Sequence, residues 1–364
     1  MDFNDRLWVF KALDTFFFRD GSPYNAGESG QTGARSVFPP FMSTLQGAVR
    51  IVLAAKRGWT PERPEKWPAE LGTPDDLGRV ELRGPYLLKG GKFLFPMPLH
   101  ILHKEDPAGG EGTYTRLQPG EAVECDLGRV RLPVPRNSLP GAKPLENAWL
   151  DEEGMSTVLN GGLPAEGQVH LSDELWREEN RVGIERDRNK RTAADKKLYS
   201  CVHVRPQNDL GLAVLVGGVP EDWHPGDVRV VRLGGEGRPA RVEVSRQMVK
   251  LPSPPELKPV DGVVRFTVTL ITPGRYADTE KVIKHGPPGI PGECVSACIG
   301  KLQTAGGWDS ENRCPRPAEP VIPAGSTWFL EAKESALEEI KSLHGKTAGA
   351  AWGYGQMVLG RWEE

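Results

Sequence analysis

The last twenty residues, Gly345–Glu364, read GKTAGAAWGYGQMVLGRWEE. Upstream, the apolar spacing from Ala332 to His344 predicts an amphipathic helix, and Gly345 is placed to cap its C-terminus. Downstream, Gln356–Trp362 is typical of a strand. The chain should therefore end in a helix, a glycine-rich basic and aromatic loop, and a closing strand.

This terminal loop has the composition of a binding loop. Glycine lets a bare backbone approach a phosphate chain or another main chain, and aromatic rings can stack on bases. The alternative is a mobile C-terminal tail, but such a tail seldom ends in an apolar, strand-like run. The candidate binding residues are Lys346, Gly349, Trp352, Gly353, Tyr354 and Gly355.

A second informative stretch lies near the N-terminus, where Arg6–Leu13 is typical of a strand and a helix follows. Leu45, Ala48, Val49, Val52 and Leu53 recur at the spacing of one buried helix face. Ser43 and Gln46 are expected to form a capping box at the start of that helix. The free N–H groups of a helix start attract anions, which makes Ser43, Gly47 and Arg50 on the opposite face candidate phosphate contacts. Ordinary capping with a solvated Arg50 is the alternative.

The remaining elements indicate two α+β halves. Proline occupies four of the nine positions in Leu251–Pro259, which we interpret as the boundary between domains 1–250 and 255–364. Both halves begin with a strand and contain hairpins, an order typical of split β-α-β units with helices on one face of a sheet. Further expected elements are a helix over Leu171–Asn180, a half-buried strand over Val264–Ile271, and hairpins pairing 86–88 with 93–95, 200–205 with 210–216, and 228–233 with 240–245.

Composition limits the class of protein. The net charge of −3 over 364 residues argues against a protein that coats nucleic acid non-specifically, so RNA contacts must come from local basic clusters. Five cysteines, an odd number, fit a reducing compartment better than a disulfide framework. No stretch approaches the roughly 18 apolar residues of a membrane helix, and the N-terminus lacks a signal sequence. We therefore expect a soluble cytoplasmic protein with no membrane contact.

Two basic segments could contact RNA. The glycine-rich loop from Arg19 to Arg35 offers the donors Arg19, Asn25, Ser29 and Arg35, although a solvated loop explains it equally well. The run from Arg181 to Lys197 carries four more positive than negative charges, including those of Arg186, Arg188, Lys190 and Arg191. Such a run can grip an RNA backbone or fold on binding, whereas the alternative is a solvated charged loop.

Metal and nuclease chemistry have weaker support. Cys294, Cys298 and Cys314, near His285, lack a second close pair of ligands, so we expect buried thiols and neither metal nor cofactor. Among the seven histidines, His344 beside the glycine loop is the leading candidate for the general base of a metal-independent ribonuclease. The competing interpretation is that His344 caps the last carbonyls of its helix.

Six segments in order carry a resemblance to a known family. They are LDTFFFRDG (13–21), PPFMSTLQGAVR (39–50), RVGIERDRNKRTAADKKLY (181–199), GGWD (306–309), PAGSTWFL (323–330) and the terminal glycine loop. In this order they resemble the third subunit of the Cmr module, a RAMP-superfamily protein of type III-B CRISPR effector complexes. The segment 107–145 and the stretch after Tyr276 depart from the family pattern.

The resemblance implies an α+β fold of two ferredoxin-like, RNA-recognition-motif-like domains with long insertions. It also implies a non-catalytic subunit that holds the 5′ tag of the CRISPR RNA and meets target RNA only indirectly. The implied protein partners are the large polymerase-like subunit and the backbone RAMP subunits. Two other classes stay open: a metal-independent endoribonuclease that processes CRISPR RNA, and a subunit that makes only protein contacts.

Overall fold

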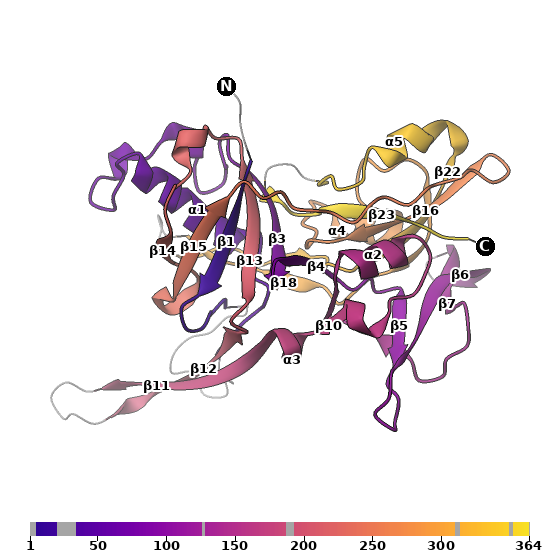
Figure 1. The fold of residues 1–364 in the computed structure, drawn as a ribbon, viewed down its shortest axis with the longest axis horizontal. Coiled ribbons are helices and arrows are strands. Elements are labelled where there is room, and N and C mark those ends of the chain that lie inside the picture. Colours follow the sequence, from indigo (N-terminus) through magenta and orange to yellow (C-terminus); the bar gives the residue numbers. More distant parts are fainter. Residues whose placement is uncertain are drawn as a thin grey trace. The chain divides into compact units, whose positions relative to one another are not determined.

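The computed structural model describes residues 5–19, 34–125, 128–186, 193–309, 314–348 and 352–363. The chain divides into two compact units, each assembled from three stretches of sequence. Unit 1 comprises Met1–Gly90, Asp173–Met248 and Thr304–Glu319, and unit 2 comprises Gly91–Ser172, Val249–Gln303 and Pro320–Glu364. Both units are mixed α/β and rich in strands (Figure 1). Within the described residues, no helix is both long and apolar enough to cross a membrane.

The core of unit 1 is an antiparallel sheet covered by one long helix. Its strands lie in the order β3 (Glu81–Lys89), β13 (Leu210–Gly217), β1 (Arg6–Ala12), β15 (Pro239–Ser245) and β14 (Arg229–Arg232). The central strand β13 is apolar and buried along its whole length, as expected for a strand covered on both faces. Helix α1 (Met42–Lys56) packs its apolar face against this sheet and contacts β3 and β14 (Figure 1).

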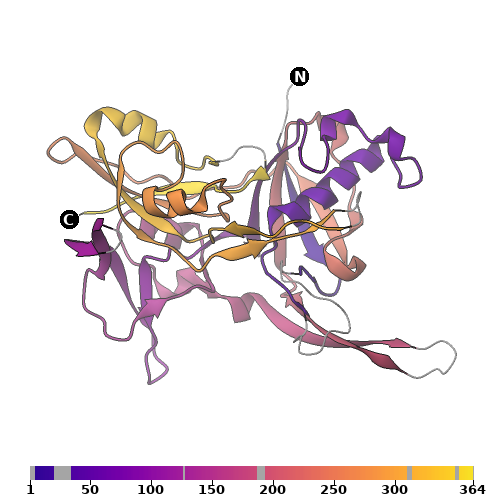
Figure 2. The ribbon, with the colours of Figure 1, turned by 180° about the vertical axis from the view of Figure 1, so that it is seen from behind.

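A long ribbon completes unit 1. Strands β11 (Trp176–Arg186) and β12 (Ala193–Pro206) pair in antiparallel fashion, and the short β2 (Ala34–Arg35) adds to β12 in parallel. The ribbon projects from the unit 1 sheet (Figure 2). Shorter elements of this unit are η1 (Pro64–Lys66), η2 (Ala69–Leu71), η4 (Glu221–Trp223), η5 (Gly235–Gly237), β19 (Trp308–Asp309) and β20 (Cys314–Pro315).

Unit 2 is organised around a second antiparallel sheet. Its order is β17 (Glu293–Cys298), β22 (Thr327–Lys333), β16 (Val263–Leu270) and β23 (Met357–Arg361). Phe266 and Trp328 are fully buried in its core. The short helices are α4 (Thr279–His285), η6 (Glu334–Ala336) and α5 (Leu337–Lys341).

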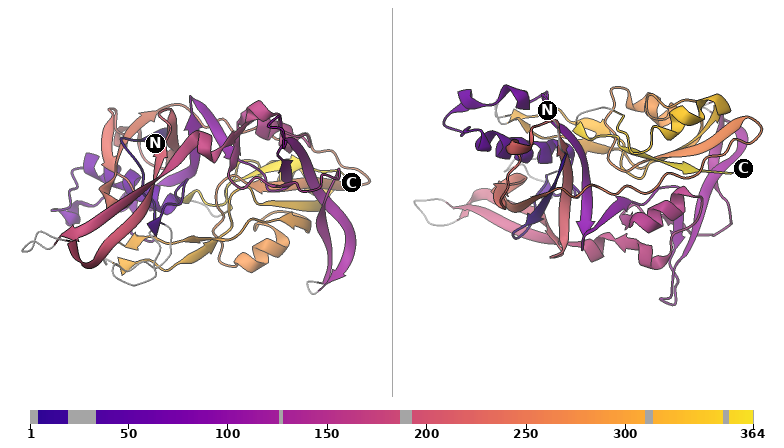
Figure 3. Two further views of the ribbon diagram at one scale, coloured as in Figure 1. Left: turned by 90° about the horizontal axis from the view of Figure 1, so that it is seen from below. Right: turned by 45° about the horizontal axis from the view of Figure 1, so that its top comes forward.

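A smaller sheet and a further helix surround this core. Strands β7 (Gly128–Pro135), β6 (Thr113–Cys125), β5 (Ile101–Lys104) and β8 (Lys143–Pro144) lie in that order, and β6 and β7 form a long curved hairpin (Figure 3). Helix α2 (Glu152–Leu159) contacts β4 (Lys92–Pro96), β9 (Ala148–Leu150) and β23. The remaining elements of unit 2 are η3 (Glu166–Gln168) and β10 (Val169–Leu171). Three short elements each contain residues of both units: α3 (Ser172–Leu175), β18 (Gln303–Ala305) and β21 (Glu319–Val321).

The two sheets share one strand order. Numbered along the chain, the strands β1, β3, β13 and β15 of unit 1 lie in the spatial order 4-1-3-2. Strands β16, β17, β22 and β23 of unit 2 lie in the same order, and neighbouring strands among these four are antiparallel in both sheets. A helix follows the first strand in each case.

Several local predictions are confirmed. The first strand, the buried face of the helix over 45–53 and the hairpin of β14 with β15 are all present. The terminal strand is present as β23. The segments 86–88 and 93–95 also lie in strands, β3 and β4.

Other predictions are wrong. Helix α1 begins at Met42 with Phe41 as its N-cap, so Ser43 and Gln46 form no capping box; instead Gln46 Nε2 donates to the Ser43 carbonyl at 3.0 Å. The segment 171–180 contains only the one-turn helix α3 before the chain enters β11. Strands β12 and β13 belong to different sheets, so the predicted hairpin across 206–209 does not form.

Two further departures concern unit 2. The predicted helix over 332–344 starts later, at η6 and α5, because Ala332 and Lys333 still pair with Val264 and Val263 as part of β22. Strand β16 is not half-buried, since Thr267 and Thr269 on its polar face are as buried as the apolar residues between them.

Candidate nucleic-acid interface

The start of α1 presents a bare stretch of backbone. Ser43 and Gly47 are half-buried there. A Cβ atom built at Gly47 would meet none of the described atoms within 4 Å, so a phosphate or a second main chain has room to approach. This helix start remains a candidate anion site.

Arg50 does not lie on a solvated face. Its side chain is buried, Nη1 donates to Gln46 Oε1 at 2.9 Å, and Nη2 donates to the Thr73 carbonyl at 2.7 Å. The guanidinium also lies over the ring of Trp67 at 5.4 Å. Desolvation lowers the pKa of Arg50 below its usual value. In this conformation Arg50 ties α1 to the loop that follows it.

Replacing Arg50 by alanine should therefore destabilise the fold. The change leaves the Thr73 carbonyl without its charged donor, and we expect the free energy of unfolding to fall by about 1–2 kcal/mol. Urea denaturation of the variant measures this, with Arg63→Ala at an exposed position as the control. An unchanged midpoint in both variants would contradict the structural role of Arg50.

The predicted donors of the first loop are only partly described. Asn25 and Ser29 lie outside the described residues. Arg19 forms a backbone bridge with Ser36, and Arg35 lies exposed on β2 opposite Val202. Of the two residues that the structure describes, both are exposed, and Arg35 lies on a paired strand whereas Arg19 forms an isolated bridge.

The basic run over 181–197 begins with a neutralised arginine. Arg181 donates to Asp14 Oδ2 and to Glu179 Oε1, both at 2.8 Å. Arg186 ends β11, but its side chain is not described, and Arg188, Lys190 and Arg191 lie outside the described residues. The charge of Arg181 is thus balanced by Asp14 and Glu179, and the side chains of the other predicted RNA contacts of this segment are not described.

The terminal glycine loop packs closely against its own unit. Gly353 and Gly355 adopt left-handed φ values of 73° and 69°, which glycine accepts without strain. Thr272 Oγ1 donates to the Gly353 carbonyl and accepts from the Gln356 N–H. Tyr354 is only 4% exposed, so its ring is not open to a base, whereas Trp352 is half-buried and Lys346 is exposed. Gly349 lies outside the described residues.

His344 is a structural residue in this arrangement. Its Nδ1 accepts from the Leu359 N–H at 3.1 Å, and its Nε2 lies 2.7 Å from the Pro252 carbonyl. The expectation that it caps its own helix is wrong. Both ring nitrogens are engaged with backbone groups, and burial lowers the pKa of the ring. A histidine held this way is poorly placed to abstract a proton from RNA.

The expectation of three buried thiols is confirmed for Cys298 but wrong for Cys294, which is half-buried, and for Cys314, which is exposed. Cys294 and Cys298 lie on β17, where burial raises their pKa values to about 11 and about 12. Cys314 is exposed on β20 in unit 1. The described residues do contain one cluster of metal-binding groups, Cys201, His203 and Glu236, which sequence spacing alone did not indicate.

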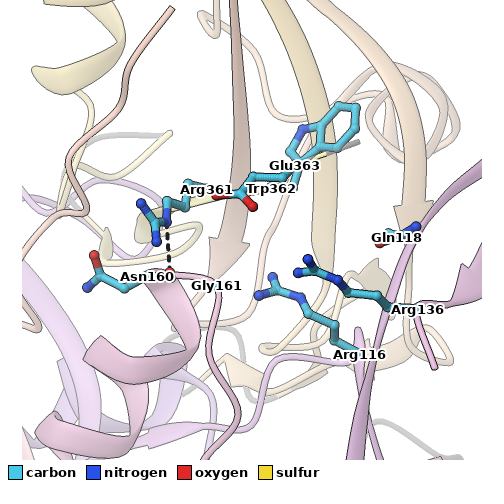
Figure 4. A pocket seen from close by; sticks show the side chains of 8 residues that line it. All are labelled: Arg116, Gln118, Arg136, Asn160, Gly161, Arg361, Trp362 and Glu363. Carbon is cyan, nitrogen blue, oxygen red and sulfur yellow. Dashed lines mark hydrogen bonds between the residues drawn. The ribbon is translucent and has the colours of Figure 1, made fainter. Parts of the chain in front are cut away.

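A cationic pocket that the sequence did not reveal lies in unit 2 (Figure 4). Its volume is about 240 Å³, and its walls come from β6, the residue after β7, the C-terminal end of α2 and the end of β23. We call it the arginine pocket. Its lining residues are Arg116, Gln118, Arg136, Asn160, Gly161, Arg361, Trp362 and Glu363.

The arginine pocket brings three positively charged side chains together. The guanidinium groups of Arg116 and Arg136 point into the space bounded by Asn160 and Arg361 (Figure 4). Arg361 Nε donates to the Asn160 carbonyl at 2.8 Å, which holds this third guanidinium in place. Glu363 is the one carboxylate among the lining residues, so the pocket carries a net positive charge.

Arg116 is the most constrained of the three. Its side chain is only 7% exposed, and Nη2 lies 3.5 Å from Nε2 of the buried His100. Desolvation, reinforced by the neighbouring Arg136 and Arg361, lowers its pKa to about 10. A buried guanidinium beside two others is stabilised by an anion, and a phosphate matches its planar donor geometry.

Gly161 lets the pocket form. A Cβ atom at this position would lie 3.2 Å from Arg116 Nη1, and the residue has a left-handed φ of 85°. Trp362 also lines the pocket, but its indole points away from the guanidinium groups (Figure 4) and is buried, with Nε1 donating to the Leu330 carbonyl. The pocket thus combines one buried guanidinium, that of Arg116, with the exposed Arg136 and Arg361.

A protein-family comparison identifies the chain. The family model for CRISPR-associated protein (Cas_Cmr3) matches residues 8–362. The chain belongs to this family. The resemblance to the third Cmr subunit that six sequence segments predicted is therefore confirmed. No curated protein sequence matches the chain.

Two of the solved structures similar to this Cas_Cmr3 chain are of the type III-B Cmr-beta complex. A chain of the type III-B Cmr-beta complex bound to cognate target RNA and AMPPnP matches with a TM-score of 0.53 and 17% identity, covering 92% of this chain and 88% of that one. A chain of Cmr-beta bound to cognate target RNA matches with a TM-score of 0.51 and 16% identity, covering 93% and 89%. At these identities the match establishes the fold.

Proposed function

We propose that this Cas_Cmr3 protein is a non-catalytic RNA-binding subunit of a type III-B CRISPR effector complex. It holds the 5′ tag of the CRISPR RNA, docks to the large polymerase-like subunit and the backbone RAMP subunits, and meets target RNA only through the assembled complex. Family membership over 8–362 supports the complex. The arginine pocket is the observation that carries the RNA-binding role, because three clustered guanidinium groups fit phosphate.

The strand order of each unit supports two ferredoxin-like, RNA-recognition-type domains. The order 4-1-3-2 with a helix after the first strand is that of a split β-α-β sheet. The four strands of the first sheet fall within 1–250, and those of the second fall within 255–364. We therefore keep these two segments as the proposed domains, with the other strands and the β11–β12 ribbon as insertions.

The proposed RNA contacts fall into two groups. In unit 1 they are the α1 start with Ser43 and Gly47, the exposed Arg35, and Arg19, Asn25 and Ser29 in the same loop, with Arg186, Arg188, Lys190 and Arg191 of the ribbon. In unit 2 they are Lys346 and Trp352 of the terminal loop and the arginine pocket. Arg50, Gly353, Tyr354 and Gly355 then act chiefly by shaping these surfaces, and Gly349 of the terminal loop is kept as a proposed RNA contact.

Crosslinking tests the assignment directly. The assembled complex is irradiated with a guide RNA photolabelled in its 5′ tag, and crosslinked peptides are mapped. Crosslinks in 19–35, at Trp352 or at the pocket residues are the expected result. Crosslinks confined to other subunits would reduce this chain to a protein-only adaptor.

Removing a single exposed contact should have a modest, salt-dependent effect. Arg35→Ala is expected to weaken guide binding and to reduce the slope of log K against log salt by about 0.7, the value for one phosphate contact on a single strand. Fluorescence anisotropy at several salt concentrations measures the slope. Arg63→Ala removes the same charge from an exposed loop of unit 1 and is expected to leave the slope unchanged.

The endoribonuclease alternative has a simple assay. Purified protein incubated with repeat RNA in EDTA is expected to leave the RNA intact, because His344 is held by backbone groups on both ring nitrogens. A discrete product that disappears in His344→Ala would instead establish cleavage by this chain.

A further inference from the structure

Three side chains with metal-binding atoms meet in unit 1, beside the part of β12 that pairs with β2. Cys201 and His203 are two residues apart on β12, so they lie on the same face of the strand. Glu236 lies in η5, in the turn between β14 and β15. Cys201 Sγ is 3.7 Å from Glu236 Oε1, His203 Nε2 is 3.2 Å from Glu236 Oε2, and the ligand atoms all lie within 4.8 Å of one another.

The orientation of His203 points to a ligand. Its side chain is fully buried, its ring stacks on Phe17, and its Nδ1 lies 2.9 Å from the hydroxyl of the equally buried Thr15. Despite its closeness to Glu236, Nε2 has no hydrogen-bond partner of acceptable geometry among the described residues. A buried ring nitrogen without a partner is costly. If Nδ1–H donates to Thr15, the lone pair of Nε2 points at the cluster.

The backbone at Glu236 is a second unusual feature. Glu236 adopts a left-handed φ of 54° in the sequence Gly234-Gly-Glu-Gly237, where glycine is the residue normally found. Its carboxylate also lies 3.4 Å from Arg238 Nη2. A carboxylate held at a strained position, beside a buried thiol and a buried imidazole, is the arrangement expected of a ligand set.

We propose that Cys201, His203 and Glu236 bind a divalent metal ion of the zinc type, with a water molecule as the fourth ligand. Tetrahedral zinc with ligand distances of about 2.0–2.3 Å places its ligand atoms roughly 3.3–3.8 Å apart, and these three groups, within 4.8 Å of one another, would draw slightly closer on binding. A thiolate with an imidazole favours zinc over magnesium or calcium. Thiolate and carboxylate together balance the charge of the ion, and the thiol proton of Cys201 passes to solvent on binding.

The site would join two parts of unit 1. It links β12 at the base of the β11–β12 ribbon to the turn between β14 and β15 at the edge of the main sheet. Thr15 would act as a positioning residue, because its hydroxyl fixes the tautomer and the angle of the His203 ring. Metal binding would therefore stabilise the attachment of the ribbon to the main sheet.

Cobalt titration of the full chain tests the site. Protein stripped with a chelator under reducing conditions is titrated with Co²⁺, and zinc affinity is then measured by competition. The expected result is one equivalent bound, with a thiolate-to-cobalt charge-transfer band and the strong visible bands of a four-coordinate ion. Cys201→Ser should abolish the charge-transfer band, whereas Cys294→Ser and Cys314→Ser should retain it.

Glu236→Gly separates ligand loss from misfolding. Glycine relieves the left-handed backbone, so the metal-free variant should melt at a higher temperature than the metal-free parent protein, while its metal affinity falls at least tenfold. Thr15→Val should lower affinity about 10–100-fold without changing the stoichiometry. The proposal would be overturned if the parent protein bound metal no more tightly than Cys201→Ser. It would also be overturned if Glu236→Gly bound metal with the same affinity as the parent protein.

Discussion

Replacing Arg136 and Arg361 together by alanine is expected to weaken binding of a tag-containing CRISPR RNA by about two orders of magnitude or more. Each hydrogen bond between a guanidinium and a phosphate contributes about 1.5–3 kcal/mol, so two such contacts are worth at least about 3 kcal/mol. Each factor of ten in affinity corresponds to about 1.4 kcal/mol. Arg116 is left in place because it is buried against His100 and its removal would disturb the core.

The measurement is anisotropy of a labelled guide RNA over a range of salt concentrations. Losing two phosphate contacts should also reduce the salt slope by about 1.4 on a single strand. The matched control is Arg129→Ala with Lys143→Ala, which removes two exposed positive charges from β7 and β8 of the same small sheet. If the pocket variant and this control bind RNA equally well, the pocket has no role in holding the guide.

Lysine at both positions gives a finer test. Arg136→Lys with Arg361→Lys keeps the charge but loses the planar, bidentate donor geometry of arginine. Affinity between that of the parent protein and that of the alanine variant would indicate that geometry as well as charge is used. Affinity equal to the parent would mean that the pocket acts only as a local positive field.

Local periodicity predicted the elements whose partners are near in sequence. Leu45, Val49 and Leu53 repeat at the helical period, so their burial on one face of α1 follows from the sequence alone. The β14–β15 hairpin similarly needs only a short glycine-rich turn. In both cases the determining contacts lie within a few residues.

Secondary-structure predictions failed where pairing with a strand distant in the sequence determines the conformation. Ala332 and Lys333 fit an amphipathic helix, but backbone pairing with β16, some seventy residues earlier, keeps them in a strand. The predicted helix over 171–180 also included Trp176, yet Trp176 lies in β11 and pairs with Pro206 at the end of β12. Propensity is a weak preference, and hydrogen bonds supplied by a long-range neighbour override it.

The residues of the candidate site likewise divide into those that neighbouring sequence could predict and those that it could not. Lys346 and Trp352 could be named because glycine, lysine and aromatic residues are adjacent in the terminal loop. The arginine pocket could not, because Arg116 and Arg136 lie in a segment with no recognisable motif and Arg361 is more than two hundred residues away. Arg50 illustrates the reverse error, since helical spacing placed it on the polar face but could not show that the following loop covers it.

Acid should destabilise the protein through His224 by about 3 kcal/mol between pH 7 and pH 4. The ring is 5% exposed, and its Nδ1 accepts from Trp8 Nε1 at 3.1 Å. Burial, assisted by the positive charges of Arg6 and Lys56, lowers the pKa of His224 from 6.5 to about 4. The unfolded chain therefore binds more protons than the folded one between these values. Stability is fully present above about pH 6.5 and is lost as the pH falls toward 4.

Urea denaturation at pH 7, 6, 5 and 4 measures this loss. His224→Gln offers Trp8 an uncharged acceptor, so its free energy of unfolding should fall less than that of the parent protein by about 3 kcal/mol over the same range. Some acid sensitivity should persist, because burial also lowers the pKa values of His100 and His344. His285→Gln, on the exposed end of α4, controls for the removal of a histidine as such. Parallel pH profiles for the parent and His224→Gln would show that protonation of His224 does not limit the stability of unit 1 in acid.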